Sequence, residues 1–217
     1  MNTNTNIVIP TIRTIHEDIN KRDTIVLFTL DVFDELVRNI PATTIKNIIR
    51  GTLIKTQSYM TPIKENIDTL ASLLKGKHVF DMGCGSGSLT YLLSNMGIDI
   101  DAYDLEEPTY CFDNSHTYVY TSTDLTDICR VKPDVVILSW PDYDSGFAYR
   151  VATFCLLESI PIYYLGEGYG GCTGDDEFHD LLTNAFTCDE DTSLLLNSTY
   201  RSYPCIYDKW SVFIPKY

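Results

Sequence analysis

Three glycines separated by single residues follow an apolar segment that contains an acid. The segment is Val79–Gly87, in which Asp81 precedes Gly83, Gly85 and Gly87. Glycine permits a tight turn and lets the backbone approach a ligand closely. Where such a turn leads from a strand into a helix, the helix begins with free N–H groups and a partial positive charge. The sequence therefore predicts a binding turn for a polar or charged ligand.

Two classes of ligand use this layout, and the glycine spacing separates them. A dinucleotide site has the pattern G-x-G-x-x-G, but here Gly87 comes one residue early and Ser88 stands where the third glycine is needed. The carboxylate of Asp81 would repel a phosphate, whereas it would attract the ammonium and sulfonium groups of S-adenosylmethionine. The spacing therefore favours S-adenosylmethionine, and a nucleotide- or dinucleotide-dependent oxidoreductase is the disfavoured alternative.

Residues 81–87 resemble the first motif of the class I S-adenosylmethionine-dependent methyltransferases, which is an acid followed by G-x-G-x-G. The resemblance covers roughly residues 61–217 and implies a Rossmann-like fold with S-adenosyl-L-methionine as the cofactor. It also implies that the acid and the three glycines of the motif bind this cofactor. Residues 166–178 are similar to a stretch in uncharacterised methyltransferase-like proteins of large DNA viruses and fungi. On that likeness we expect a viral protein, although the likeness identifies no substrate.

Acids also follow the next two predicted strands. Asp104 ends the second strand, where a carboxylate can accept hydrogen bonds from both hydroxyls of a ribose. The family resemblance implies this role for Asp104, with Leu105 beside it, and Glu106 is the fallback if the strand runs longer. In the family an acid after the third strand binds the adenine amino group, which implies Asp124 and Leu125 as adenine contacts. The alternative for Asp124 is that it caps a short helix.

The fourth strand of the alternating region ends next to the methyl-transfer position of the resembling family. Amino-group methyltransferases often carry [D/N]-P-P-[Y/F] there, and of that motif this chain keeps only Pro141, between Trp140 and Asp142. Ser139 and Asp142 are candidates for orienting a nucleophile. Trp140, Pro141 and Tyr143 are candidates for lining the substrate pocket. The alternative is an ordinary strand-end turn with a buried tryptophan.

A glycine-rich loop follows the fifth strand, with five glycines within residues 166–174. Ligands of open α/β folds bind at the carboxyl ends of the strands, so this loop is expected near the site. Glu167 is the candidate general base, and Tyr169 is expected to shape the substrate pocket. The alternative is a flexible loop with Glu167 in solvent.

The elements that position these residues alternate between strand and helix from His78 onward. This alternation predicts an α/β fold with helices on both faces of a parallel sheet, here a Rossmann-like, seven-stranded, mostly parallel sheet. An antiparallel C-terminal hairpin of two strands, 193–199 and 210–214, is expected at one edge. The other predicted strands are residues 78–82, 98–103, 117–121, 134–139 and 160–165, and helices are predicted over residues 88–96 and 147–158.

Residues 1–60 are predicted to form an N-terminal helical extension to a methyltransferase domain of residues 61–217. Apolar residues at spacings of three and four predict an amphipathic helix over residues 26–40, ended by Pro41, although residues 25–28 can also be read as a strand. A second helix is expected to begin at Thr61 as its N-cap and to end at Gly76.

The composition indicates which partners and which cellular compartment to expect. There are 16 Lys and Arg against 30 Asp and Glu, a net charge of −14, which disfavours nucleic acid as substrate unless a basic partner is present. Seven cysteines without a C-x-x-C pair predict no metal site. With no signal peptide and no apolar run of membrane-spanning length, we expect a cytoplasmic protein in a reducing compartment that binds no membrane.

Together these residues predict an S-adenosylmethionine-dependent methyltransferase that acts on a small molecule or a protein side chain. The alternative, favoured by the incomplete motif at the fourth strand, is a catalytically degenerate cofactor-binding or scaffolding subunit of a methyltransferase complex. A partner subunit is compatible with both hypotheses.

Overall fold

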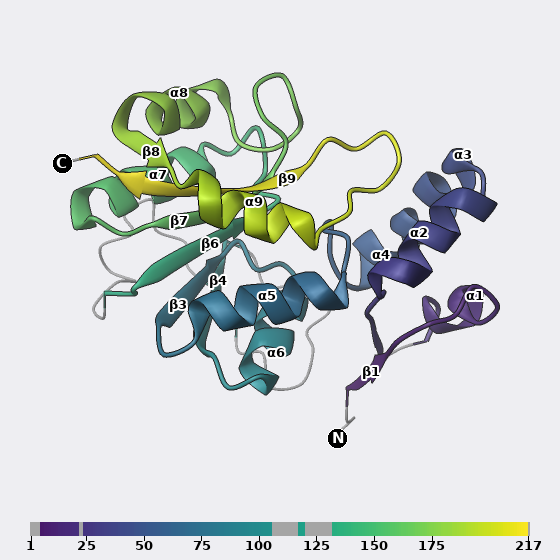
Figure 1. The fold of residues 1–217 in the computed structure, drawn as a ribbon. Coiled ribbons are helices and arrows are strands. Elements are labelled where there is room, and N and C mark those ends of the chain that lie inside the picture. The colour runs from purple at the N-terminus through teal and green to yellow at the C-terminus, as the bar shows by residue number, and fades with distance from the viewer. Residues whose placement is uncertain (1–4, 22–23, 106–116, 120–131, 217) are drawn as a thin grey trace.

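The structure is a computed structural model, and it describes residues 5–21, 24–105, 117–119 and 132–216 (Figure 1). Within these residues a seven-stranded sheet has the order β5-β4-β3-β6-β7-β9-β8. The strands from β5 to β7 are parallel neighbours, as predicted, and β9 runs antiparallel to both β7 and β8. The strands are β3 (His78–Met82), β4 (Asp99–Asp104), β5 (Thr117–Val119), β6 (Val135–Ser139), β7 (Ile162–Gly166), β8 (Phe186–Cys188) and β9 (Lys209–Pro215).

The antiparallel edge differs from the expected hairpin, because residues 193–199 are not a strand. They lie mostly in helix α9 (Glu190–Ser198), which connects β8 to β9. Asp189 caps this helix, since its side chain accepts a hydrogen bond from the backbone N–H of Thr192 at 3.1 Å. The leucine run that resembles a strand has Leu194 65% exposed and Leu196 fully buried, which is the one-sided burial of a surface helix.

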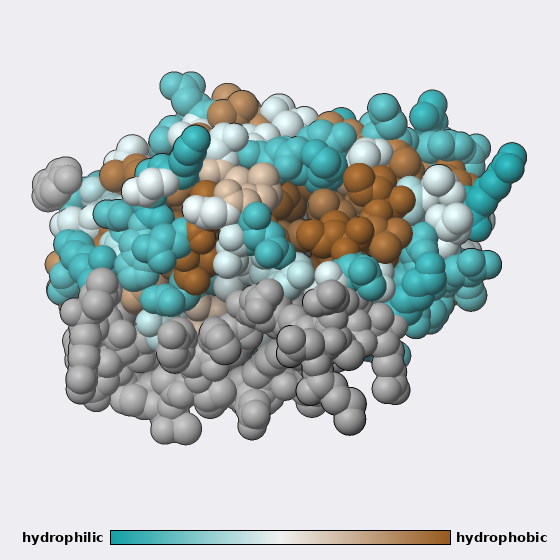
Figure 2. Space-filling model, turned by 90° about the horizontal axis from the view of Figure 1, so that it is seen from below, coloured by the Kyte–Doolittle hydropathy of each residue, from teal (hydrophilic) through white to brown (hydrophobic). Residues whose placement is uncertain are grey.

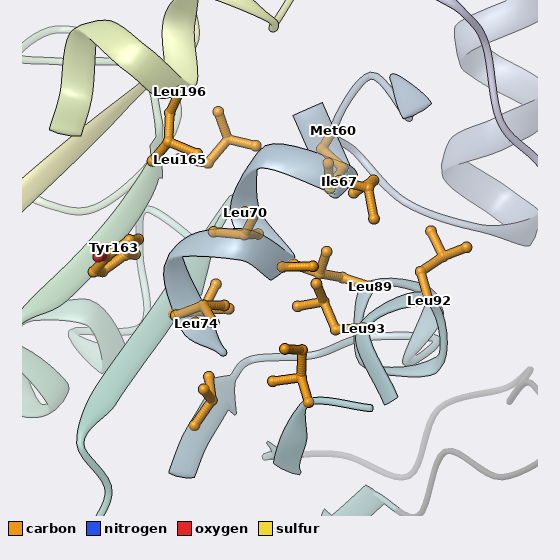
Figure 3. Close-up of a cluster of buried hydrophobic side chains, with 14 of the residues drawn as sticks. Met60, Ile67, Leu70, Leu74, Leu89, Leu92, Leu93, Tyr163, Leu165 and Leu196 are labelled. Carbon is orange, nitrogen blue, oxygen red and sulfur yellow. The ribbon is translucent and has the colours of Figure 1, made fainter. Parts of the chain in front are cut away.

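Helices cover both faces of the sheet. On one face lie α5 (Lys64–Leu74), α6 (Ser88–Asn95) and α9, and on the other lie α7 (Phe147–Glu158) and α8 (Asp176–Ala185) (Figure 1). Neighbouring residues of β6 divide between the two cores: Ile137 packs with α5 and α6, and Leu138 packs with α7. Figure 3 shows leucines of α5 and α6 that approach one another in the first core. Hydrophobic side chains are thus buried on both faces of the sheet, and this packing holds the sheet and helix α6, which follows β3, in place.

The N-terminal part combines a small parallel sheet with short helices. Its elements are β1 (Asn6–Val8), α1 (Ile15–Asp18), β2 (Thr24–Val26), α2 (Leu30–Asn39), α3 (Ala42–Thr44), the π-helix η1 (Ile45–Arg50) and α4 (Gly51–Thr56). The strand reading of residues 25–28 is therefore the better one for β2, and the helix begins only at Leu30 because Thr29 caps it. Thr61 is not the N-cap of α5, which begins two residues after Pro62.

This N-terminal part packs directly on the sheet domain. Ile25 and Leu27 belong to the same core as α5 and α6, and Phe28 forms a β-bridge with Ile63. The boundary at residue 60 stays a prediction. The segment between α4 and α5 contacts the turn after β3, because the carbonyl oxygen of Gln57 accepts hydrogen bonds from the hydroxyls of Ser86 and Ser88.

Some hydrophobic residues are exposed among the hydrophilic residues of the surface. Figure 2 shows one face of the molecule, on which hydrophobic residues form a patch between hydrophilic ones. At the N-terminus Ile7 is 46% and Ile9 48% exposed. Among the described residues, no helix combines the length and the apolar character that crossing a membrane requires.

Candidate functional site

The glycine turn between β3 and α6 is held against the end of β4. The backbone N–H groups of Gly83 and Cys84 both donate to the carbonyl oxygen of Tyr103, at 2.8 and 3.1 Å. Gly83, Gly85 and Gly87 have φ angles of 78°, 54° and 73°. A side chain at any of these positions would strain the backbone, since L-residues rarely adopt the left-handed region. The three glycines are thus required by the path of the turn itself.

Two of these glycines meet different surroundings. A Cβ atom placed on Gly83 would lie 3.0 Å from the ring of Phe147 on α7, so this glycine permits close packing. A Cβ atom placed on Gly85 would meet no heavy atom within 4 Å. The turn therefore presents open space beside Gly85, which is where the sequence predicts a ligand against the backbone.

Asp104 lies at the end of β4, next to this open space. Its Oδ2 accepts a hydrogen bond from the N–H of Gly85 at 2.7 Å, and its Oδ1 accepts one from the N–H of Leu105 at 2.7 Å. The carboxylate is therefore fixed at the turn rather than directed away from it. The structure brings Asp104 and the glycine turn together, as a ribose site would require. The other predicted contacts, Glu106, Asp124 and Leu125, lie outside the described residues.

Asp81 lies on β3, just before the turn, and its side chain is buried. Its Oδ2 accepts a hydrogen bond from the hydroxyl of Thr90 on α6, at 2.7 Å. Burial raises the pKa of Asp81 to about 6, the hydrogen bond from Thr90 opposes this rise, and the charge of Asp104 adds to it. A buried carboxylate that is ionised near neutral pH costs stability, and such groups are concentrated at functional sites.

The loss of stability that comes with ionising the buried Asp81 carboxylate gives a first prediction. The folded protein binds more protons than the unfolded chain between the unfolded pKa of 3.8 and about 6. The free energy of unfolding therefore falls as the pH rises through that window. We expect Asp81→Asn to be more stable than the wild type by up to about 3 kcal/mol at about pH 7.5, and by almost nothing at about pH 4. Chemical denaturation at the two pH values measures this, and equal stability at about pH 7.5 would contradict it.

Trp140 follows β6 in an unusual backbone conformation. Its φ is 55°, a strained value for a bulky residue, and such strain clusters at functional sites. Three contacts hold it there: its N–H donates to the carbonyl oxygen of Leu165, its indole Nε1 donates to Asp208, both at 2.8 Å, and its ring stacks on Tyr59. The side chain is partly buried and packs against the core, and its role in the substrate pocket stays a prediction.

The rest of the fourth-strand motif joins the glycine-rich loop. Asp142 forms a β-bridge with Thr173, and the carbonyl oxygen of Pro141 accepts a hydrogen bond from the N–H of Gly174 at 3.2 Å. Ser139 is partly buried at the end of β6, whereas Asp142 and Tyr143 are exposed. These three residues thus lie at the correct edge of the sheet, and their roles stay predictions.

Tyr169 is oriented toward α8. It is 57% exposed, its hydroxyl hydrogen-bonds the carboxylate of Asp180, and its ring lies 5.0 Å from that of His179. These contacts anchor Tyr169 to a helix beside the glycine-rich loop. They do not by themselves support its predicted role in the substrate pocket.

Glu167 is buried, so the alternative of a solvent-exposed carboxylate on a flexible loop is wrong. Its Oε2 accepts a hydrogen bond from the N–H of Cys172 at 2.9 Å, and its Oε1 accepts one from the N–H of Tyr207 at 3.1 Å. Burial alone would raise the pKa of Glu167, but these two hydrogen bonds and the charge of Arg50 outweigh it, and the pKa is lowered. A lowered pKa makes a weak base, so the contacts favour a role in joining two loops. The role as general base stays a prediction.

A second prediction separates these two roles. A glutamine at position 167 has only one acceptor oxygen for two N–H groups, so Glu167→Gln should lower the free energy of unfolding by about 1–3 kcal/mol at neutral pH. Because the folded pKa is depressed, this loss should shrink as the pH falls. Glu158→Gln, at an exposed position beside Lys132, is the control and should change little. Unchanged stability together with slower methyl transfer would instead favour the general base.

The sequence did not point to several residues that converge on Trp140. The guanidinium carbon of Arg50 lies 5.0 Å from the ring centroid of Trp140, 5.9 Å from that of Tyr59 and 6.0 Å from that of Tyr203. Asp208, which binds the indole, is also buried. Arg50 ends a π-helix, an element that is frequent at functional sites. Neither the π-helix nor these long-range contacts leave a pattern in the sequence.

The sheet order, the glycine turn at the end of β3 and the acid at the end of β4 define a Rossmann-like methyltransferase fold. A model of the family described as "Tellurite resistance protein TehB" matches residues 49–157, about half of the chain, and this protein belongs to that family. The cofactor of this family is S-adenosylmethionine. A search of curated protein sequences gave no match. The resemblance of residues 166–178 to viral and fungal proteins stays a prediction.

Solved structures similar to this chain include methyltransferases. A TehB-like SAM-dependent methyltransferase from Corynebacterium glutamicum is 16% identical, with 70% of this chain and 87% of that chain covered and a TM-score of 0.48. The magnesium protoporphyrin IX methyltransferase from Synechocystis, solved with bound SAM, is 16% identical, with 70% and 79% covered and a TM-score of 0.46. The family assignment rests on the family model.

Proposed function

We propose that this protein binds S-adenosylmethionine between the glycine turn and Asp104 and transfers its methyl group to a small molecule or a protein side chain. The observation that carries the proposal is the open space at Gly85 beside a fixed carboxylate. Backbone without a side chain suits the amino-acid part of the ligand, and the carboxylate suits two ribose hydroxyls. The residues present therefore fit this cofactor.

The roles of the residues follow from where they lie. When bound, S-adenosylmethionine would supply a methyl group on its sulfonium. The nucleophilic atom of the acceptor would form a bond to the methyl carbon as the carbon–sulfur bond breaks, which would leave a neutral thioether, and the acceptor would release its proton to solvent. Asp104 binds the ribose, and the buried negative charge of Asp81 favours a cationic ligand above the turn. Ser139 and Asp142, at the end of β6, orient the acceptor. Such a transfer depends on positioning rather than on covalent catalysis.

The acceptor class is inferred from charge. A net charge of −14 opposes the approach of a polyanion, so a small molecule or a protein side chain is favoured over nucleic acid unless a basic partner supplies the surface. We propose that the protein acts in the cytoplasm without binding a membrane.

Isothermal titration of the full chain with S-adenosylhomocysteine and, separately, with NAD tests the proposal. We expect saturable binding of S-adenosylhomocysteine and none of NAD. Binding of NAD alone, or of neither ligand, would refute the proposed cofactor. Binding of S-adenosylhomocysteine without consumption of S-adenosylmethionine in the presence of small-molecule and protein extracts would favour the degenerate subunit instead.

A further inference from the structure

Within the part of the chain that the structure describes, four buried polar atoms have no hydrogen-bond partner. They are the Nε of Arg50, the Oγ1 of Thr61, the hydroxyl of Tyr203 and the Oδ1 of Asp208. Most buried polar atoms of native proteins are paired, so unpaired ones need an explanation. Four of them in one region indicate a place where the protein alone does not complete the hydrogen bonding.

Contacts link these residues into one cluster. Arg50 lies over the rings of Trp140 and Tyr203, and Trp140 donates to Asp208 at 2.8 Å. Tyr200 then connects Asp208 to Thr61: its hydroxyl donates to the Oδ2 of Asp208 at 2.7 Å and accepts from the N–H of Thr61 at 3.2 Å. The cluster therefore joins the N-terminal part, the end of β6 and the segment before β9.

The cluster also connects to the predicted cofactor turn. The hydroxyl of Ser88, at the start of α6, donates to the carbonyl oxygen of Gln57 at 3.1 Å, and that of Ser86 in the turn bonds the same oxygen. The chain then runs from Gln57 through Tyr59, whose ring stacks on Trp140 with centroids 5.7 Å apart and 21° between planes. Hydrogen bonds to Gln57, two residues before Tyr59, and ring contacts from Tyr59 through Trp140 to Arg50 therefore link the turn to Arg50.

We propose that Arg50, Tyr59 and Trp140 form the binding site for the methyl acceptor, and that the acceptor is an aromatic carboxylate. This inference rests on the proposed function. Tyr59 is 50% exposed and offers a ring face to a flat molecule. Arg50 is partly exposed, and among the described residues its guanidinium has no ion-pair partner. A guanidinium binds a carboxylate through two parallel hydrogen bonds.

The acids near Arg50 accept their hydrogen bonds from groups other than its guanidinium. Glu167 accepts two backbone hydrogen bonds, and the Oδ2 of Asp208 accepts those of Trp140 and Tyr200. Lys46, one helical turn before Arg50, adds a second positive charge that acts on Cys172 in the glycine-rich loop. The sulfonium of the bound cofactor would add a third, so an organic anion suits this edge of an otherwise acidic protein.

Fluorescence of Trp140 provides a test that does not depend on turnover. Benzoate and 2-naphthoate are compared with benzamide and 2-naphthamide, which keep the ring and lack the charge. We expect saturable quenching, with each carboxylate bound at least about tenfold more tightly than its amide, because hydrogen bonds to charged groups are the stronger ones. Trp140→Phe identifies the signal, since Trp210 is buried and its indole is paired with Asn66.

Arg50→Gln should abolish the preference for the carboxylates, and Tyr59→Leu should weaken all four probes while keeping the preference. Arg38→Gln, on the exposed side of α2, removes the same charge and should change nothing. Calorimetry with S-adenosylhomocysteine on each variant shows whether the cofactor site is intact. Equal binding of carboxylates and amides, no saturable binding of either carboxylate, or a preference that survives Arg50→Gln would overturn the inference. If wild-type protein fails to bind S-adenosylhomocysteine, the proposed function fails instead.

Discussion

Replacing Gly85 with valine should abolish the binding of S-adenosylhomocysteine without unfolding the protein. A Cβ atom at this position meets no protein atom within 4 Å, so the valine side chain would occupy the space assigned to the ligand rather than collide with the fold. The N–H of Gly85 is also the donor that fixes Asp104. We expect calorimetry to give an affinity lower by on the order of 100-fold or more, equivalent to about 2.8 kcal/mol.

Gly97→Val is the matched control for this substitution. Gly97 also has a left-handed backbone, with a φ of 81°, and a Cβ atom there likewise meets nothing within 4 Å. It precedes β4, whereas Gly85 lies against the end of that strand, so the two glycines are at opposite edges of the sheet. Both variants should lose about 1–2 kcal/mol of stability from backbone strain, but only Gly85→Val should lose the ligand. Equal affinity in the two variants would mean that nothing binds against Gly85.

The sequence predicts the strand, the glycine turn and the helix of the proposed cofactor site well, because these elements are local. Residues 78–82 form β3 with the predicted bounds, and the turn and α6 follow directly. The apolar run of β3, the glycine spacing and the helix start are short-range properties that the chain order preserves. Asp104 is predictable for a similar reason, because it ends the next strand, and parallel neighbours bring their carboxyl ends together.

Of the residues in the proposed acceptor site the sequence points only to Trp140, because the others are far from it in the chain. Arg50, Trp140 and Asp208 meet only after the N-terminal helices, the end of β6 and the segment before β9 have packed. Glu167 shows the same limit: its glycine-rich context suggests a mobile loop. The partners that bury it are backbone groups of Cys172 and of the distant Tyr207.

Local pattern also failed where tertiary contacts override it. The three consecutive leucines at 194–196 favour a strand, but Asp189 caps a helix there, and only Leu196 is fully buried. The segment around Ile25 permits both readings, and its parallel pairing with β1 makes it a strand. In both cases the deciding interaction is a cap or a neighbouring strand, and apolar periodicity contains no information about either.

Replacing Asp104 with asparagine should weaken the binding of S-adenosylhomocysteine by about 10- to 100-fold, because hydrogen bonds to a charged group contribute about 1.5–3 kcal/mol. The two carboxylate oxygens now accept the N–H groups of Gly85 and Leu105. An asparagine has one acceptor oxygen, so its NH₂ group must face one of these donors, and it also loses the charge that attracts the ribose hydroxyls.

Asp101→Asn is the matched control, because Asp101 lies on the same strand three residues earlier and its contact is with His78 at 3.1 Å. It removes the same unit of charge without touching the turn, so its affinity for S-adenosylhomocysteine should equal that of the wild type. Calorimetry on both variants separates a direct contact from a general change in net charge. Equal weakening in both variants would mean that Asp104 affects binding only through long-range electrostatics. Wild-type affinity in Asp104→Asn would show that the ribose is bound elsewhere.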